Sequence, residues 1–97
     1  MENKISMFMA KSYDLVVGDT FQLFYWGIIK STNPYNYEIV ATCEKGKHFP
    51  RYFEFTPTET GRYPLNVSLY DDNLNLVASA DTILNVVKPA PSKKTIN

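Results

Sequence analysis

Apolar and polar residues alternate with a period of two along most of this chain. Phe21, Leu23 and Tyr25 fall on one side of a predicted strand, while Gln22, Phe24 and Trp26 fall on the other. The same alternation is found over residues 35–43, 52–56, 63–70 and 76–87, and residues 5–16 can supply an edge strand that is broken in two. No stretch has the apolar spacing of an amphipathic helix, so the pattern predicts an all-β fold.

Turn-forming residues separate these strands. Val17-Gly18-Asp19 precedes the first strand of the core, and Gly27 predicts a bulge or bend within it. A cluster at 31–34 precedes the next strand, and Glu44-Lys45-Gly46-Lys47 follows it. The turn at 71–75 joins the last two strands, whose hairpin we expect to be the most secure pairing.

The segment from Thr56 to Asp72 combines a turn, a glycine, a tyrosine and a long alternating strand. The spacing of Gly61 and Tyr63 is typical of the corner of an immunoglobulin-like (Ig-like) sandwich, where the tyrosine hydroxyl bonds to upstream backbone. Cys43 is the single cysteine, and Leu65 stands where an antibody-type domain has its second cysteine. We therefore predict an Ig-like β-sandwich of about seven antiparallel strands without a disulfide, with Gly61 and Tyr63 as its structural corner.

The length and charge of the chain narrow the range of functions that it can have. The 97 residues suffice for one domain, with ten basic and ten acidic residues and no basic stripe, which argues against nucleic acid as a partner. No stretch approaches the roughly 18 apolar residues of a membrane span, and no signal-peptide core is present. We expect residues 1–87 to form the sandwich, and residues 88–97 to be a proline-containing linker toward a further C-terminal domain.

One motif resembles a catalytic block. Gly18-Asp19-Thr20 is similar to the G-D-S nucleophile motif of SGNH hydrolases, with Thr20 in the place of the nucleophile. A turn entering a strand is favoured, because no helix follows Thr20 and His48, the single histidine, lacks the accompanying D-x-x-H pattern. We predict no catalytic residue, no metal ligand and no cofactor, so that the chain itself is not an enzyme.

Other polar motifs have ordinary structural explanations. Asp71, Asn73 and Asn75 alternate like calcium ligands, but the glycine and glutamate of an EF-hand are absent, so a hairpin turn is favoured over a weak cation site. Leu74 stands where a glycine is expected. His48 is expected at the surface, and Cys43 as a small buried or half-buried thiol.

Five aromatic residues are candidates for a face that stacks on sugars or docks a protein, the alternative being core or cross-strand packing. They are Trp26, Tyr35, Tyr37, Tyr52 and Tyr70.

A resemblance extends over roughly residues 14–87. The segments that carry the resemblance are Val17-Gly18-Asp19-Thr20, Asn33-Pro34-Tyr35-Asn36-Tyr37, the run from Phe53 to Leu65, and Tyr70-Asp71-Asp72-Asn73. In these segments the chain resembles the Ig-like domain that precedes the hydrolase domain in some bacterial SGNH/GDSL esterases. Thr95-Ile96-Asn97 is similar to the start of that hydrolase's first strand.

The resemblance implies a non-catalytic accessory domain of an esterase or lipase-acylhydrolase that acts on acylated sugars or lipids. Its partner would be the C-terminal catalytic domain of the same polypeptide, and its location extracellular or at the cell surface. The alternative is a carbohydrate-binding or adhesive Ig-like module of a bacterial surface protein.

Overall fold

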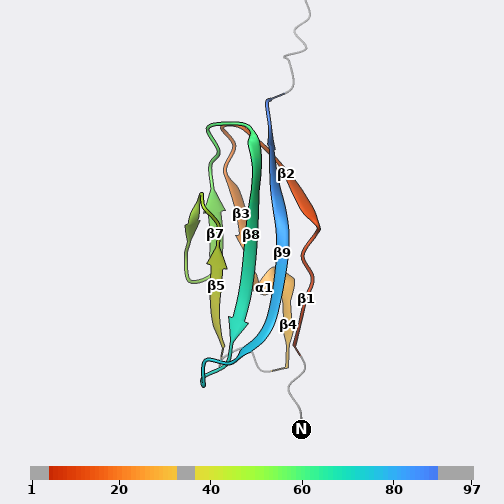
Figure 1. Ribbon diagram of the computed structural model, residues 1–97, viewed down its shortest axis with the longest axis vertical. Helices are drawn as coiled ribbons and strands as arrows, with labels where there is room; N and C mark the ends of the chain where they lie inside the picture. The colour runs from red at the N-terminus through yellow and green to blue at the C-terminus, as the bar shows by residue number, and fades with distance from the viewer. Residues whose placement is uncertain (1–4, 33–36, 90–97) are drawn as a thin grey trace, which may run out of the picture.

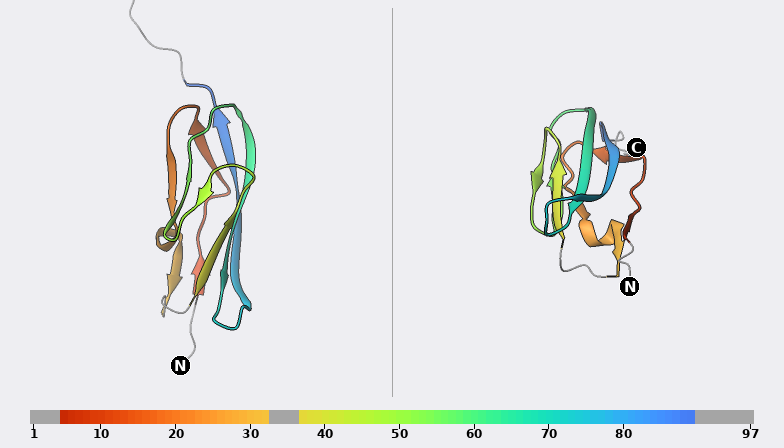
Figure 2. Two further views of the ribbon diagram at one scale, coloured as in Figure 1. Left: turned by 90° about the vertical axis from the view of Figure 1, so that its left-hand side faces the viewer. Right: turned by 60° about the horizontal axis from the view of Figure 1, so that its bottom comes forward.

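The computed structural model describes residues 5–32 and 37–89, which form two packed β-sheets and a further, two-stranded sheet (Figures 1 and 2). The elements are β1 (Ile5–Met7), β2 (Ser12–Val16), β3 (Phe21–Phe24), α1 (Tyr25–Ile28), β4 (Ile29–Ser31), β5 (Glu38–Thr42), β6 (Lys47–His48), β7 (Tyr52–Phe55), β8 (Gly61–Tyr70) and β9 (Leu76–Val87). The two packed sheets have the strand orders β2-β9-β8-β5 and β3-β7-β6, and the two-stranded sheet consists of β1 and β4. The predicted all-β, Ig-like sandwich is confirmed.

The core lies between the two sheets. The three-stranded sheet contributes Leu23, Phe53 and Phe55, which are all buried. Facing them on β8 are Leu65, Val67 and Leu69, each no more than 1% exposed. Leu65, which stands where an antibody-type domain has a cysteine, is thus buried apolar surface, and packing takes the place of the missing disulfide.

The N-terminal segment changes sheets. β1 pairs antiparallel with β4, whereas β2 pairs with β9 in parallel, from Ser12 opposite Ile83 to Val16 opposite Val87. The predicted break within residues 5–16 is confirmed. The parallel pairing departs from the antiparallel arrangement that we expected, because after the switch β2 runs in the same direction as the last strand.

A single helical turn replaces the bend expected at Gly27. α1 comprises the four residues Tyr25–Ile28 and interrupts what would otherwise be one strand made of β3 and β4. The backbone amide of Tyr25 donates to the carbonyl of Arg51, and the side chains of Tyr25 and Ile28 are buried. The turn therefore sets a large aromatic side chain into the core.

The β8–β9 hairpin is the longest pairing among the described strands, and its prediction is confirmed. Its register runs from Gly61 opposite Val86 to Tyr70 opposite Leu76, with a shift between Leu69 and Tyr70. In the connecting turn, Leu74 has a φ of 65°, the left-handed conformation in which a glycine was expected, and its side chain is 72% exposed.

The strand predicted over residues 35–43 is observed as β5 from Glu38 to Thr42, and residues 33–36 lie outside the described residues. The last strand ends at Val87, where we placed the end of the sandwich. Of the predicted linker, residues 90–97 also lie outside the described residues. No helix among the described residues is long and apolar enough to cross a membrane.

Candidate functional site

The outer face of the three-stranded sheet carries rows of like side chains across its strands. Phe24 pairs with Tyr52, and Gln22 pairs with Glu54. Glu54 in turn pairs with Lys47 on β6. Because every second residue of a strand points to the same side, these side chains share the face that turns away from the core.

The first row is aromatic. The ring centroids of Phe24 and Tyr52 lie 5.2 Å apart at an interplanar angle of 40°, and those of Phe49 and Tyr52 lie 4.9 Å apart at 24°. The amide of Phe49 donates to the carbonyl of Tyr52 over 2.8 Å, which holds the two residues opposite each other. Phe24 is 53% exposed and the other two rings are half-buried. We call Phe24, Tyr52 and Phe49 the aromatic row.

The neighbouring row is polar. The side-chain amide of Gln22 donates to a carboxylate oxygen of Glu54 over 2.8 Å, and Lys47 lies opposite Glu54 on the other side. One further step along the strands, the hydroxyls of Thr20 and Thr56 are hydrogen-bonded at 2.8 Å. We call Gln22, Glu54 and Lys47 the polar row.

A shallow hollow opens along this face. It measures about 420 Å³, and Lys47, Phe49, Glu54 and Thr56 are among the residues that line it. Its wall therefore includes a ring of the aromatic row and two charged groups of the polar row. Stacking surface and hydrogen-bonding groups are both accessible from the same hollow.

Of the five aromatic residues predicted as a binding face, the four that the structure describes do not lie together. Tyr52 is part of the aromatic row, and Trp26, on α1, is 40% exposed. Tyr37 packs against the core, and Tyr70 lies on the other sheet beside the hairpin turn. Tyr35 lies outside the described residues.

Two members of the aromatic row, Phe24 and Phe49, were missed. Phe24 could have been found, because the alternation of β3 already assigns it to the outward side with Gln22. Phe49 could not, because its position depends on the chain reversal between β6 and β7 that sets it against Tyr52.

The outer face of the four-stranded sheet is different in character. The side-chain amide of Asn66 donates to Ser79 Oγ, the Ala80 carbonyl and Asp81 Oδ1, and Ser68 donates to Asn66 Oδ1. The three bonds from Asn66 join β8 to β9, so this side chain acts in strand pairing.

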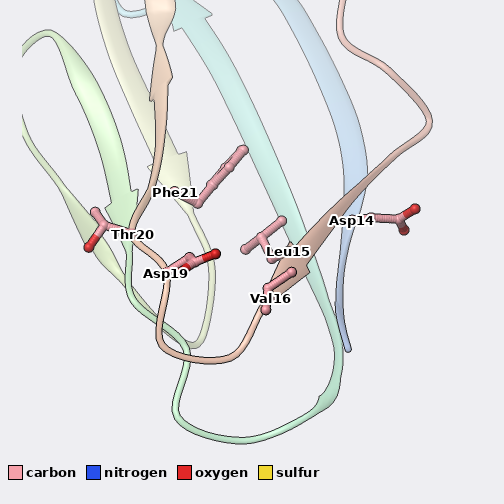
Figure 3. Close-up of a pocket in the computed structure, with 6 residues that line it drawn as sticks. All are labelled: Asp14, Leu15, Val16, Asp19, Thr20 and Phe21. Carbon is pink, nitrogen blue, oxygen red and sulfur yellow. The ribbon is translucent and has the colours of Figure 1, made fainter. Parts of the chain in front are cut away.

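The motif that is similar to a catalytic block is a turn that enters a strand, as we expected. Gly18 has a φ of 93° and its amide donates to the Pro57 carbonyl, while the Thr20 hydroxyl is bonded to Thr56. Beside it lies a hollow of about 160 Å³ (Figure 3), in which the Asp14 carboxylate points away from Leu15 and Phe21. Asp14 accepts a hydrogen bond from Asn85 instead, so the hollow does not bring Asp14 to Thr20.

His48 is exposed, and its ring is nevertheless engaged with the core. Its Nδ1 lies 2.6 Å from the hydroxyl of Tyr25, which is 0% exposed. Burial raises the pKa of Tyr25 to about 12. The imidazole thus serves as the hydrogen-bond partner of a core phenol and is not paired with Thr20.

The polar hairpin loop and the cysteine also have structural roles. Asp71 Oδ1 accepts from the amides of Asn73 and Asn75, and these hydrogen bonds lower the pKa of the exposed Asp71 carboxyl.

Cys43 is half-buried, and burial is the main cause that raises the pKa of its thiol. Nowhere in residues 5–32 and 37–89 do three His, Cys, Asp or Glu side chains form a group that could hold a metal ion.

Gly61 and Tyr63 lie where the chain crosses from one sheet to the other, at the start of β8. The expected bond from the Tyr63 hydroxyl to upstream backbone is absent among the described residues. Instead, the ring lies against Gly61, where an added Cβ would come within 3.0 Å of Tyr63 Oη, and meets Phe55 edge-on at 5.6 Å. The corner is therefore held by ring packing.

Comparison with solved structures finds a similar fold in fibronectin(III)-like modules of CbhA from Clostridium thermocellum. The TM-score is 0.51 at 10% sequence identity, over 88% of this chain and 98% of that one. At this identity the likeness concerns the fold alone. No family model matches the chain, and no curated protein matches it significantly.

Proposed function

We propose that the chain is a non-catalytic Ig-like accessory module of a bacterial SGNH/GDSL-type esterase or lipase-acylhydrolase. The hydrolase part of this proposal rests on the resemblance over residues 14–87. The module would position the catalytic domain of the same polypeptide, outside the cell or at its surface. Its own contribution would be mechanical or adhesive, without bond cleavage.

The observation that carries the proposal is the path of the chain through the sandwich. β1 begins at one pole of the molecule and β9 ends at the opposite pole (Figure 1). A module with this path can hold two flanking segments apart along one axis. Such a geometry suits a spacer between domains, since a segment attached at either pole does not cover the sheet faces.

The two side chains that a hydrolase mechanism on the Gly18-Asp19-Thr20 motif would need, Thr20 and His48, are engaged in the fold, which supports the non-catalytic part. The Thr20 hydroxyl bonds Thr56, and the His48 imidazole bonds Tyr25. A serine-hydrolase mechanism needs nucleophile and base within hydrogen-bond reach of each other. Here each has a different partner: Thr56, which follows β7, for the Thr20 hydroxyl, and Tyr25, on α1, for the His48 imidazole.

Ester hydrolysis tests this proposal. The chain and the full-length protein are assayed with p-nitrophenyl acetate under identical conditions. We expect turnover by the full-length protein and none above buffer by the chain. Turnover by the chain that is lost in Thr20→Ala or His48→Ala would overturn the non-catalytic assignment.

A second candidate is a carbohydrate-binding or adhesive module without an attached hydrolase. The observation that favours it is the aromatic row, in which Phe24 is 53% exposed, beside the polar row. The two candidates differ in the domain that is attached to the module, because an adhesive protein would continue with another sandwich or a wall anchor.

A further inference from the structure

Phe24, at one end of the aromatic row, is more exposed than strand pairing requires. Cross-strand contact explains why Phe24 and Phe49 each pack against Tyr52. It does not explain why Phe24 keeps 53% of its surface in water on the outward side of the sheet. Contiguous exposed apolar surface rimmed by polar groups is typical of an interaction site.

The dimensions of the row suit an extended ligand. Neighbouring strands are about 4.8 Å apart, so the rings on β3 and β7 and the ring of Phe49, which directly follows β6, span roughly 10 Å across the sheet. The polar row lies two residues along the strands, at about 6.8 Å from the aromatic row. A flat ring resting on the aromatic row therefore has its edge substituents close to the polar row.

The charge of the face indicates the chemistry of the ligand. Glu54 and Lys47 oppose each other across β7 and β6, and Gln22 is neutral, so the polar row has no net charge. Lys45, which also lines the hollow, adds a single positive charge, so the face lacks the cluster of basic groups that binds a phosphate-rich or acidic chain. The row does offer both donors and acceptors, which matches a ligand rich in hydroxyl groups.

We propose that the outer face of β3, β7 and β6 binds a neutral oligosaccharide. Sugar rings stack on Phe24, Tyr52 and Phe49, while their hydroxyls bond Gln22, Glu54 and Lys47. The hollow lined by Phe49, Glu54 and Thr56 receives groups that extend beyond the stacked rings. This inference deepens the carbohydrate-binding candidate and does not depend on an attached hydrolase.

The test is a calorimetric titration of the chain with cellohexaose, xylohexaose and mannohexaose. We expect saturable binding of at least one sugar and at least a tenfold loss of affinity in Phe24→Ala. Leu76→Ala is the matched control, because Leu76 is 57% exposed but lies on β9 beside the hairpin turn. The affinity of Leu76→Ala for the sugar should equal that of the unmodified chain.

A polar-row variant keeps the test informative if Phe24→Ala does not fold. Gln22 is exposed, so Gln22→Ala should keep the melting temperature while weakening sugar binding severalfold. Absence of binding by all three sugars would overturn the proposal, as would affinities unchanged in both Phe24→Ala and Gln22→Ala. Self-association by sedimentation that is lost in Phe24→Ala, without sugar binding, would instead assign the face to a second copy of the chain.

Discussion

The hydroxyl of Tyr25, a residue with no exposed surface, lies 2.6 Å from Nδ1 of the exposed His48. The two side chains come from α1 and β6, and their ring centroids are 5.4 Å apart. A core phenol thus has a hydrogen-bond partner supplied by a surface residue. This arrangement makes the fold sensitive to a position that looks replaceable in the sequence.

We predict that His48→Leu destabilises the fold by about 1–3 kcal/mol, because leucine still covers the Tyr25 hydroxyl but gives it no hydrogen-bond partner. Tyr25→Phe should cost less, about 0.5–1.5 kcal/mol, since it removes the buried polar group as well. His48→Asn should restore much of the loss, because its side-chain oxygen can take the place of Nδ1. Urea unfolding of the three variants measures these differences.

A double-variant cycle is the control for this interaction. In the Tyr25→Phe background, His48→Leu should have almost no further effect on the free energy of unfolding. An equal cost of His48→Leu in both backgrounds would show that the histidine acts through something other than the Tyr25 hydroxyl.

Alkaline pH should weaken the fold through the same tyrosine. Burial raises the pKa of Tyr25 from 10.0 to about 12, so the unfolded chain loses this proton at lower pH than the folded one. The stabilisation is fully present well below the unfolded pKa and is lost as the pH rises toward 12, by about 1 kcal/mol per pH unit between the two pKa values. Urea midpoints of the unmodified chain should fall more steeply than those of Tyr25→Phe across this window. Parallel slopes would contradict the assignment.

The corner residues should respond unequally to substitution. Tyr63→Phe should change the free energy of unfolding by less than about 0.5 kcal/mol, because the hydroxyl has no hydrogen bond among the described residues. Gly61→Ala should cost about 1–3 kcal/mol, because Gly61 has a φ of 154° and an added Cβ would meet the Tyr63 ring. Thermal melts measure both. If Tyr63→Phe lowered the free energy of unfolding as much as Gly61→Ala, the Tyr63 hydroxyl would stabilise the corner, contrary to this prediction.

Thr82 offers a stabilising substitution. It is 3% exposed, and its hydroxyl has no hydrogen-bond partner among the described residues. Thr82→Val keeps the branched shape and removes the unpaired group, so we expect a gain of about 1 kcal/mol in the free energy of unfolding. Thr82→Ala is the control, since it also removes the methyl group and leaves a small cavity. A loss of stability in Thr82→Val would mean that the hydroxyl is satisfied in solution.

The sequence was most informative where one long strand alternates without interruption. The alternation of Leu65, Val67 and Leu69 predicted the buried side of β8, and the turn at Asp71 predicted the hairpin. Such features are local, since neighbouring residues alone determine which side of a strand is apolar.

Features that depend on tertiary contacts were not predicted from the sequence, or were predicted in a different form. The single turn of α1 is too short to show a helical period, so its sequence indicated only a bend at Gly27. The parallel pairing of β2 with β9 depends on where the N-terminal segment changes sheets. The aromatic row depends on the register between β6 and β7, which brings Phe49 opposite Tyr52, the described residue of the predicted aromatic set that lies in this row.

The assignment as an accessory module of a hydrolase is tested most directly by the amino-acid sequence C-terminal to Asn97 in the full-length protein. We predict a G-D-S block, at the end of a strand and the start of a helix, within roughly the next 60 residues. A second Ig-like repeat or a wall anchor in its place would contradict the hydrolase assignment and favour the adhesive module.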